Sequence, residues 1–354
     1  MGDNGKNKKR RSGIWSFIFI AVLFAITAVY IIKEFDLKAL YEDVVSSEHM
    51  EWLIAAPILT VVFFLCFAAF MKITAKALEF RLPLYKAITY AFLDFFYTSA
   101  TPAGCGVPAA TAYAMTQDGY SGSLSSAALL MQTICYRFSQ LIFGVGAGIM
   151  VFTGAFEVEG FFKILFIVGA SLSVIVTAFF CAMLFFTRLT RKGGLLLIKL
   201  GAKLHIVKDF DATKQKFIDS LVEYRTAAQL LRSDKKLIVK QMGVTLLQRA
   251  AFFSISYMVY LSFGLHERSF FYVFFLQVAV ALAVDNLPLP GGIGVNEYAF
   301  YLLYERLYPE TDTAAAAMIL TRAFCYYIPL VFTAFAALSR EIILNVKAKR
   351  SAKK

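Results

Sequence analysis

Long apolar runs alternate with short polar segments along this chain. A helix needs about 20 apolar residues to cross the hydrocarbon core of a bilayer, and six of the runs reach that length. The pattern therefore predicts membrane-spanning helices over residues 14–32, 52–71, 124–152, 162–187, 243–263 and 313–338.

Two further apolar runs, 87–100 and 270–287, are too short to cross. Each ends in a turn rich in proline and glycine and then resumes as a short helical segment, which indicates a broken or re-entrant hairpin. The N-terminus of a half-helix offers unpaired N–H groups to an anion; a purely structural kink is the alternative. The turn residues are Pro102, Gly104 and Gly106 in the first hairpin and Pro290, Gly291, Gly292 and Gly294 in the second.

The charge of the polar segments alternates in sign, as expected for a threaded chain whose Lys/Arg-rich loops stay in the cytoplasm. Both tails and the segment 188–241 are then cytoplasmic, and the two hairpins approach the midplane from opposite faces. The net charges are +4 for 1–13, −4 for 33–51, +3 for 72–89, −2 for 153–161, +8 for 188–241, −2 for 304–312 and +5 for 339–354.

Composition supports the membrane class. Of 354 residues, 59% are hydrophobic and only 17% charged, against about 45–50% and 25% in ordinary globular domains. The net charge of +12 would suggest nucleic acid in a soluble protein, but here the basic residues border apolar segments, so we expect no nucleic-acid partner. The five cysteines and three histidines show no metal-ligand spacing, so we predict no metal site and no cofactor.

An internal repeat organises the membrane domain, 14–338. The turn at Pro102 is followed 35 residues later by Arg137, and the turn at Pro290 is followed 32 residues later by Arg322. Half one would cover 52–152 and half two 243–338, joined through 153–242. We therefore predict an all-α integral membrane protein with about six full spans plus two broken or re-entrant helical hairpins, arranged as an inverted repeat.

The linking segment 188–241 carries one apolar stripe at helical spacing, formed by Phe217, Leu221, Tyr224, Ala228 and Leu231, and a basic remainder. Such a helix suits an anionic membrane surface. A solvated linker between the two halves is the alternative.

Arg137 and Arg322 are the sharpest candidates for a binding site, because a charge at the centre of a spanning helix costs about 2.5–3.5 kcal/mol. Each needs a partner, and two roles stay open: a guanidinium fork for a lipid phosphate, or a static ion pair inside the bundle. Candidate carboxylates are Asp94, Asp285 and Glu297, the last of which could also be a helix cap. Arg249, near the start of its predicted span, is expected to extend to the interface.

Two segments resemble a known family. Residues 287–300, with Arg322 and the tyrosines 326–327 after them, are similar to the most specific motif of the lysylphosphatidylglycerol synthase transmembrane region. This flippase-like domain is the N-terminal part of multiple peptide resistance factors and occurs as stand-alone bacterial and archaeal proteins. Residues 98–108 are similar to its first motif, although Val107 stands where a polar Gln or Glu is expected.

The resemblance implies a multi-pass plasma-membrane protein, of a bacterium, that moves an anionic or lysyl-modified phosphatidylglycerol between leaflets and contributes to antibiotic resistance. The family name implies a phosphatidylglycerol lysyltransferase instead, but only 16 residues follow Leu338, so we expect no soluble transferase domain in this chain. A third hypothesis is a scaffold that docks a separately encoded lipid-modifying enzyme through 188–241. A homodimer also stays open.

Overall fold

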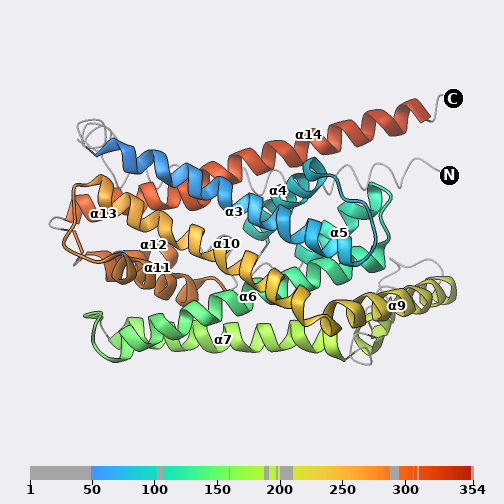
Figure 1. The fold of residues 1–354 in the computed structure, drawn as a ribbon, viewed down its shortest axis with the longest axis horizontal. Coiled ribbons are helices and arrows are strands. Elements are labelled where there is room, and N and C mark those ends of the chain that lie inside the picture. The colour runs from blue at the N-terminus through green and yellow to red at the C-terminus, as the bar shows by residue number, and fades with distance from the viewer. Residues whose placement is uncertain are drawn as a thin grey trace.

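The computed structural model describes residues 49–101, 107–158, 160–186, 191–196, 198–199, 210–287, 295–305, 307–308 and 311–351. All regular elements in these residues are helices (Figure 1), which confirms the predicted all-α class. The predicted tail 1–13 and the first predicted span, 14–32, lie outside the described residues. Five helical stretches are long and apolar enough to cross a membrane, and each overlaps one predicted span: 51–77, 122–152, 160–185, 235–262 and 313–344.

Two pairs of short helices stand between the spans. Helices α4 (Leu84–Ala100) and α5 (Val107–Gln117) flank the first predicted turn, and α11 (Phe270–Val284) and α12 (Val295–Tyr304) flank the second. The turns themselves lie outside the described residues. The α4–α5 pair lies towards the end of the bundle where α3 (Met50–Ala77) finishes, and the α11–α12 pair lies towards the other end (Figure 1).

Helix α10 (Lys235–Ser262) begins eight residues before the predicted span, which starts at 243. The Asp234 carboxylate caps it by accepting from the Lys236 and Leu237 amides at 2.9 and 3.1 Å. Hydropathy cannot detect this polar first turn, because the cap and the backbone stabilise it rather than the apolar face. Arg249 consequently lies about four turns inside the helix, and its side chain is 1% exposed. The expectation that it extends to the interface was wrong.

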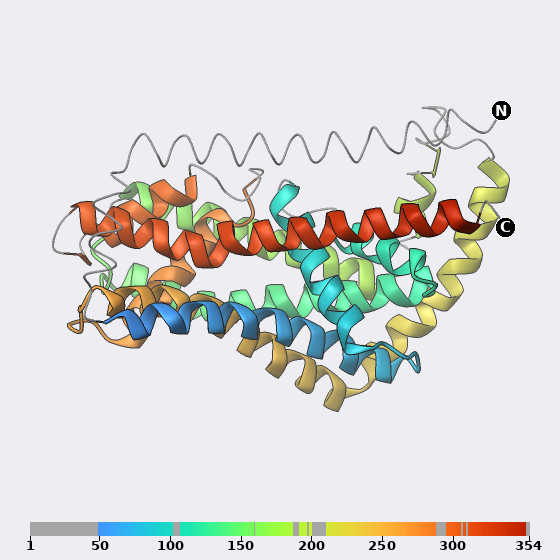
Figure 2. The same cartoon turned by 90° about the horizontal axis from the view of Figure 1, so that it is seen from above.

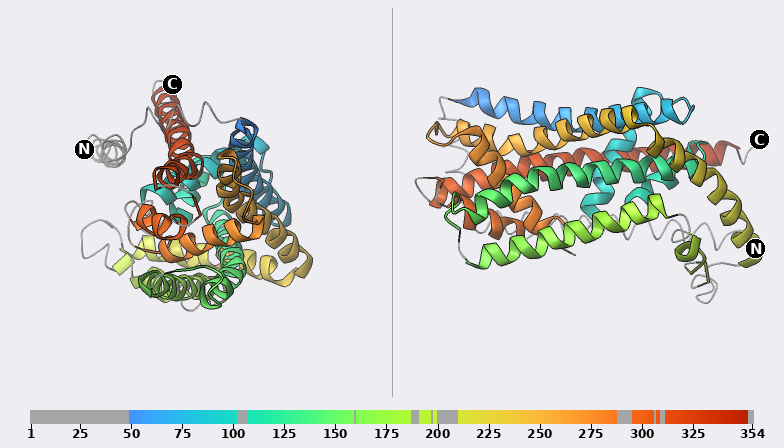
Figure 3. Two further views of the ribbon diagram at one scale, coloured as in Figure 1. Left: turned by 90° about the vertical axis from the view of Figure 1, so that its left-hand side faces the viewer. Right: turned by 60° about the horizontal axis from the view of Figure 1, so that its bottom comes forward.

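Helix α9 (Phe210–Ser233) forms the predicted amphipathic stripe, at the end of the bundle and at an angle to the spans (Figure 3). Tyr224, Ala228 and Leu231 are buried in one hydrophobic cluster with residues of α6 (Gly122–Phe152). The Ser123 hydroxyl donates to the Ser220 carbonyl at 3.0 Å. The stripe is therefore covered by protein, and burial raises the pKa of Tyr224 to about 12, so that its hydroxyl stays neutral.

The C-terminal span has a wide turn inside it. Helix α13 (Thr311–Arg322) passes through the π-helical residues Ala323–Tyr327 (η3) into α14 (Ile328–Ser351). Pro329 explains this turn, because proline has no N–H and its ring excludes the carbonyl of a preceding α-turn. The Phe324 carbonyl instead accepts from the Thr60 hydroxyl of α3 at 3.1 Å.

Helix α14 continues thirteen residues past the predicted end of the span, at 338, and runs to Ser351 along the length of the bundle (Figure 2). Arg340 fastens this extension: its Nη2 donates to the Ala114 carbonyl at 2.6 Å and lies 3.3 Å from Asp118 Oδ1. The segment 339–354 is thus helical through Ser351 rather than a plain tail; residues 352–354 lie outside the described residues.

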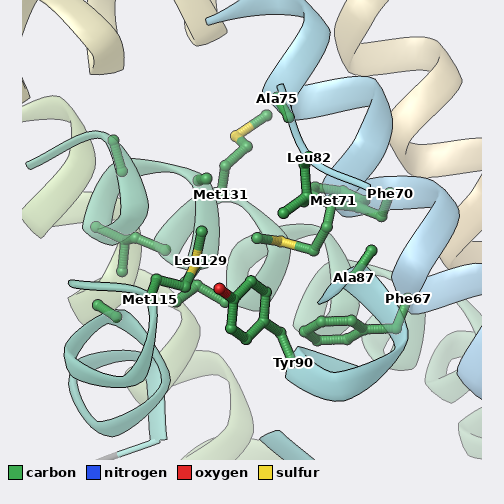
Figure 4. Close-up of a cluster of buried hydrophobic side chains, with 14 of the residues drawn as sticks. Phe67, Phe70, Met71, Ala75, Leu82, Ala87, Tyr90, Met115, Leu129 and Met131 are labelled. Carbon is green, nitrogen blue, oxygen red and sulfur yellow. The ribbon is translucent and has the colours of Figure 1, made fainter. Parts of the chain in front are cut away.

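Two large apolar clusters and one small one fill the described part of the bundle. One large cluster joins α3 to α6 around Phe67, Met71 and Tyr90 (Figure 4), and the second joins α6, α7 (Gly160–Phe185) and α10 to α13. The outer faces of α7 and α14 expose large apolar side chains, as helices facing lipid do. Examples are Ile164, Ile175, Phe179, Phe332 and Phe335.

Gly169 brings α7 and α11 close together. A Cβ atom at this position would overlap the backbone carbonyls of Leu282 and Ala283. We expect Gly169→Ala to lower the thermal unfolding midpoint measurably in detergent, because backbone cannot move aside as a side chain can. Gly148→Ala is the matched control, since its Cβ would lie 3.7 Å from the Phe166 ring, an ordinary contact. Equal midpoints for both variants would contradict the close packing.

Candidate functional site: a charged cavity inside the bundle

A cavity of about 210 Å³ lies where the two short helix pairs meet the spans α6 and α10 and the end of α13. Its wall carries five charged side chains: Asp94 from α4, Arg137 from α6, Arg249 from α10, Asp285 from the end of α11, and Arg322 from α13. Four of the five were predicted from the sequence as site residues. Backbone and side chains flanking both predicted turns also line it, among them Val107, Pro108 and Asn296.

Arg137 lies near the middle of α6, where a charge requires a partner. Its Nη1 donates to the Asn286 Oδ1 atom at 2.7 Å, and its guanidinium lies 5.2 Å from the centre of the Phe180 ring. The predicted partners were carboxylates, whereas this contact is to an amide. Asn286 directly follows Asp285, so both side chains belong to the residues that end α11.

Arg249 is held among aromatic rings. Its guanidinium carbon lies 4.2 Å from the centre of the Phe253 ring and 4.5 Å from that of Tyr136, within the range of cation–π attraction. Its Nη1 donates to the Tyr136 hydroxyl in a short hydrogen bond. Asp285 Oδ2 lies 3.6 Å from Arg249 Nη2 and accepts from Gln140 Nε2 at 2.9 Å.

Arg322 and Glu297 form a buried ion pair. Nε of Arg322 lies 2.9 Å from Glu297 Oε1, and the two side chains are only 9% and 10% exposed. The Tyr327 hydroxyl also donates to that oxygen, at 3.4 Å, and the Tyr326 ring lies 4.6 Å from the guanidinium carbon. Glu297 is in the first turn of α12. This geometry matches the static ion pair, which is one of the two roles predicted for Arg322.

Asp94 faces the cavity from α4. Within the described part of the chain, neither a donor within hydrogen-bond distance of its carboxylate nor an ion pair to it is found. Among the same residues no three His, Cys, Asp or Glu side chains are grouped as metal ligands. The predicted turn residues Pro102, Gly104, Gly106, Pro290, Gly291, Gly292 and Gly294 lie outside the described residues.

Sequence reasoning missed Arg249, Tyr136 and Asn286. The sequence shows the charge of Arg249 but not its depth, because hydropathy does not detect the polar start of α10 at Lys235. Tyr136 is adjacent to Arg137, but a helix turns by about 100° per residue, so the Tyr136 side chain contacts Arg249 while Arg137 contacts Asn286. The signal for Asn286 is its position as the second polar residue after the unbroken apolar run 278–284.

In the described part of the chain, five helices long and apolar enough to cross a membrane, together with a charged cavity inside the bundle, define a multi-pass membrane protein. The chain belongs to the family described as the lysylphosphatidylglycerol synthase TM region, which matches residues 14–332. It is also similar to a UPF0104 membrane protein of Archaeoglobus fulgidus, with 24% identity over 323 residues that cover 89% of this chain and 94% of the relative.

Proposed function

We propose that this protein moves a phospholipid between the leaflets of the membrane, with the head group passing through the charged cavity and the acyl chains staying in lipid. The observation that carries the proposal is the cavity itself: five charged side chains line one space within an apolar bundle. Ionisable residues at such depth are costly and are typical of substrate pathways. The membership of the chain in a lipid-associated family supports the same conclusion.

The proposal includes an inverted repeat, in which 52–152 and 243–338 are threaded with opposite orientation and both tails are cytoplasmic. The positions of the α4–α5 and α11–α12 pairs, towards opposite ends of the bundle, support it (Figure 1). Transporters built in this way bind substrate where discontinuous helices meet. Non-helical backbone at that depth is tolerated only when it is buried or lines a cavity, and residues beside both interruptions line this one.

Roles for the charged groups follow from chemistry. Arg137 and Arg322 would attract the phosphate of an anionic or lysyl-modified phosphatidylglycerol, and Asp94, Asp285 or Glu297 would face an ammonium group on the head. The Pro/Gly turns at Pro102, Gly104 and Gly106 and at Pro290, Gly291, Gly292 and Gly294 would present half-helix N-termini to the same phosphate.

The test is a leaflet-accessibility assay with the purified full-length chain in vesicles that contain a fluorescent phosphatidylglycerol. Protein-free vesicles leave about half of the probe protected from a membrane-impermeant quencher. We expect the protein to lower the protected fraction towards zero within minutes. No change at any protein-to-lipid ratio would contradict the proposal. Formation of lysyl lipid from lysyl-tRNA and phosphatidylglycerol by the same preparation would instead identify a transferase.

A further inference from the structure

We propose that Arg249 is the oxyanion-binding residue of the cavity, and that it binds two oxygens of a phosphate group through its Nε–Nη2 edge. The identification of this phosphate as part of a lipid head group rests on the proposed function. A free phosphate ion offers the same oxygens, and the experiment below separates the two sources.

Burial shows that Arg249 is not a solvated cation. Its side chain is 1% exposed, and it is the largest of the fully buried side chains in the described residues. Phe253, Tyr136 and Phe252 surround the guanidinium, with ring centres 4.2, 4.5 and 5.5 Å from its central carbon. Rings offset part of the cost of a buried charge, but they accept no strong hydrogen bond from its N–H groups.

The hydrogen bonds of Arg249 leave one edge unused. Nη1 donates to the Tyr136 hydroxyl, which fixes the orientation of the guanidinium plane. Nε and Nη2 are buried, and no hydrogen-bond acceptor for either of them is found in the described residues. These two atoms share one edge of the guanidinium, and their N–H bonds run parallel, the geometry that binds two oxygens of a phosphate or carboxylate at once.

Asp285 adjoins this edge without satisfying it. Its Oδ2 atom is 3.6 Å from Nη2, beyond hydrogen-bond distance, and it already accepts from Gln140. The Asp285 side chain is 39% exposed and already lines the cavity, so a carboxylate that moves away from Arg249 stays at the cavity wall. A phosphate that takes its place beside Arg249 gains two charge-assisted hydrogen bonds. The displaced carboxylate then faces the cavity, where an ammonium group on the same head would meet it.

Arg249 differs in this respect from Arg322. The Nε atom of Arg322 is already 2.9 Å from a carboxylate oxygen of Glu297, so the corresponding edge there is in use. An incoming phosphate would have to break a hydrogen-bonded ion pair of 2.9 Å at Arg322, whereas at Arg249 it displaces a longer contact of 3.6 Å and satisfies two N–H groups that lack acceptors. The phosphate therefore binds at Arg249 first.

The experiment measures binding to the full-length protein in detergent, with inorganic phosphate and a short-chain phosphatidylglycerol as separate probes, by calorimetry or ligand-induced thermal stabilisation. We expect Arg249→Lys, which keeps the charge but lacks the two-pronged edge, to weaken binding of the effective probe about 10- to 100-fold, as the loss of about 1.5–3 kcal/mol in a charged hydrogen bond predicts. Arg268→Lys is the control, since Arg268 also stacks on a tyrosine, Tyr272, but lies outside the cavity.

Asp285→Asn provides a change of opposite sign. It removes the competing negative charge, so we expect it to tighten binding of inorganic phosphate several-fold, a result that a misfolded variant cannot give. Binding of both probes would identify a phosphate site, and binding of the lipid alone a head-group site. Unchanged affinity in both Arg249→Lys and Asp285→Asn, or no binding of either probe by the unaltered protein, would overturn the assignment. Binding without lipid movement would overturn only the proposed function.

Discussion

Arg322→Ala is expected to lower the free energy of unfolding by about 3–5 kcal/mol, the largest loss of stability we predict for this chain. The side chain leaves behind Glu297, which is 10% exposed and has its Oε1 atom 2.9 Å from the missing guanidinium. A buried carboxylate without its cation must be either desolvated or protonated, and both are costly. Denaturant titration of the purified protein in detergent measures the effect.

The double variant Arg322→Ala/Glu297→Gln is the control for this prediction. It removes both charges, so we expect it to recover most of the lost stability, because a neutral amide is far cheaper to bury than a carboxylate. If the double variant also moves lipid at the normal rate, the pair is a structural contact between α12 and α13. If it is stable but inactive, the pair belongs to the head-group site. Full stability of the single variant would contradict the observed burial.

Arg137→Gln is expected to slow lipid movement in vesicles by about 10- to 100-fold, on the order of one lost charged hydrogen bond of 1.5–3 kcal/mol. Arg137 faces the cavity from the middle of α6. Glutamine keeps an N–H donor for Asn286 Oδ1, so the contact that fastens the end of α11 can survive while the cation is lost. The readout is the initial rate of quenching of fluorescent phosphatidylglycerol.

Arg268→Gln serves as the comparison, because it removes an arginine that is outside the cavity and exposed. Both variants are compared at equal amounts of monodisperse protein. An equal rate for Arg137→Gln and the unaltered protein would remove Arg137 from the head-group path, and an equal slowing by Arg268→Gln would point to a general effect of lost positive charge.

The helical class and the approximate positions of five spans could be predicted because long apolar runs leave no alternative in a bilayer. The ends of the helices could not be predicted as well. Asp234 starts α10 in polar sequence, and Arg340 extends α14 by binding Ala114 and Asp118 across the bundle. Both effects arise from hydrogen bonds, to which hydropathy is blind.

The candidate site could be predicted in part for a related reason. A charge inside an apolar run is visible in the sequence, and Asp94, Arg137, Asp285 and Arg322 do line one cavity. Which charge pairs with which is a matter of rotation about each helix axis, and an error of one residue turns a side chain by about 100°. The pairing of Arg137 with Asn286 therefore depends on the packing of α6 against the end of α11, which the sequence does not show.

The π-turn at Ala323–Tyr327 has a consequence for how the last span can change. It holds one more residue than an α-turn would, and so sets the angular phase between α13, which aims Arg322 at the cavity, and α14, which aims Arg340 at α5. Loss of a single residue here would rotate one half by about 100° against the other. An insertion or deletion in this short stretch, which continues into a helix at both ends, is therefore far less tolerable than a substitution.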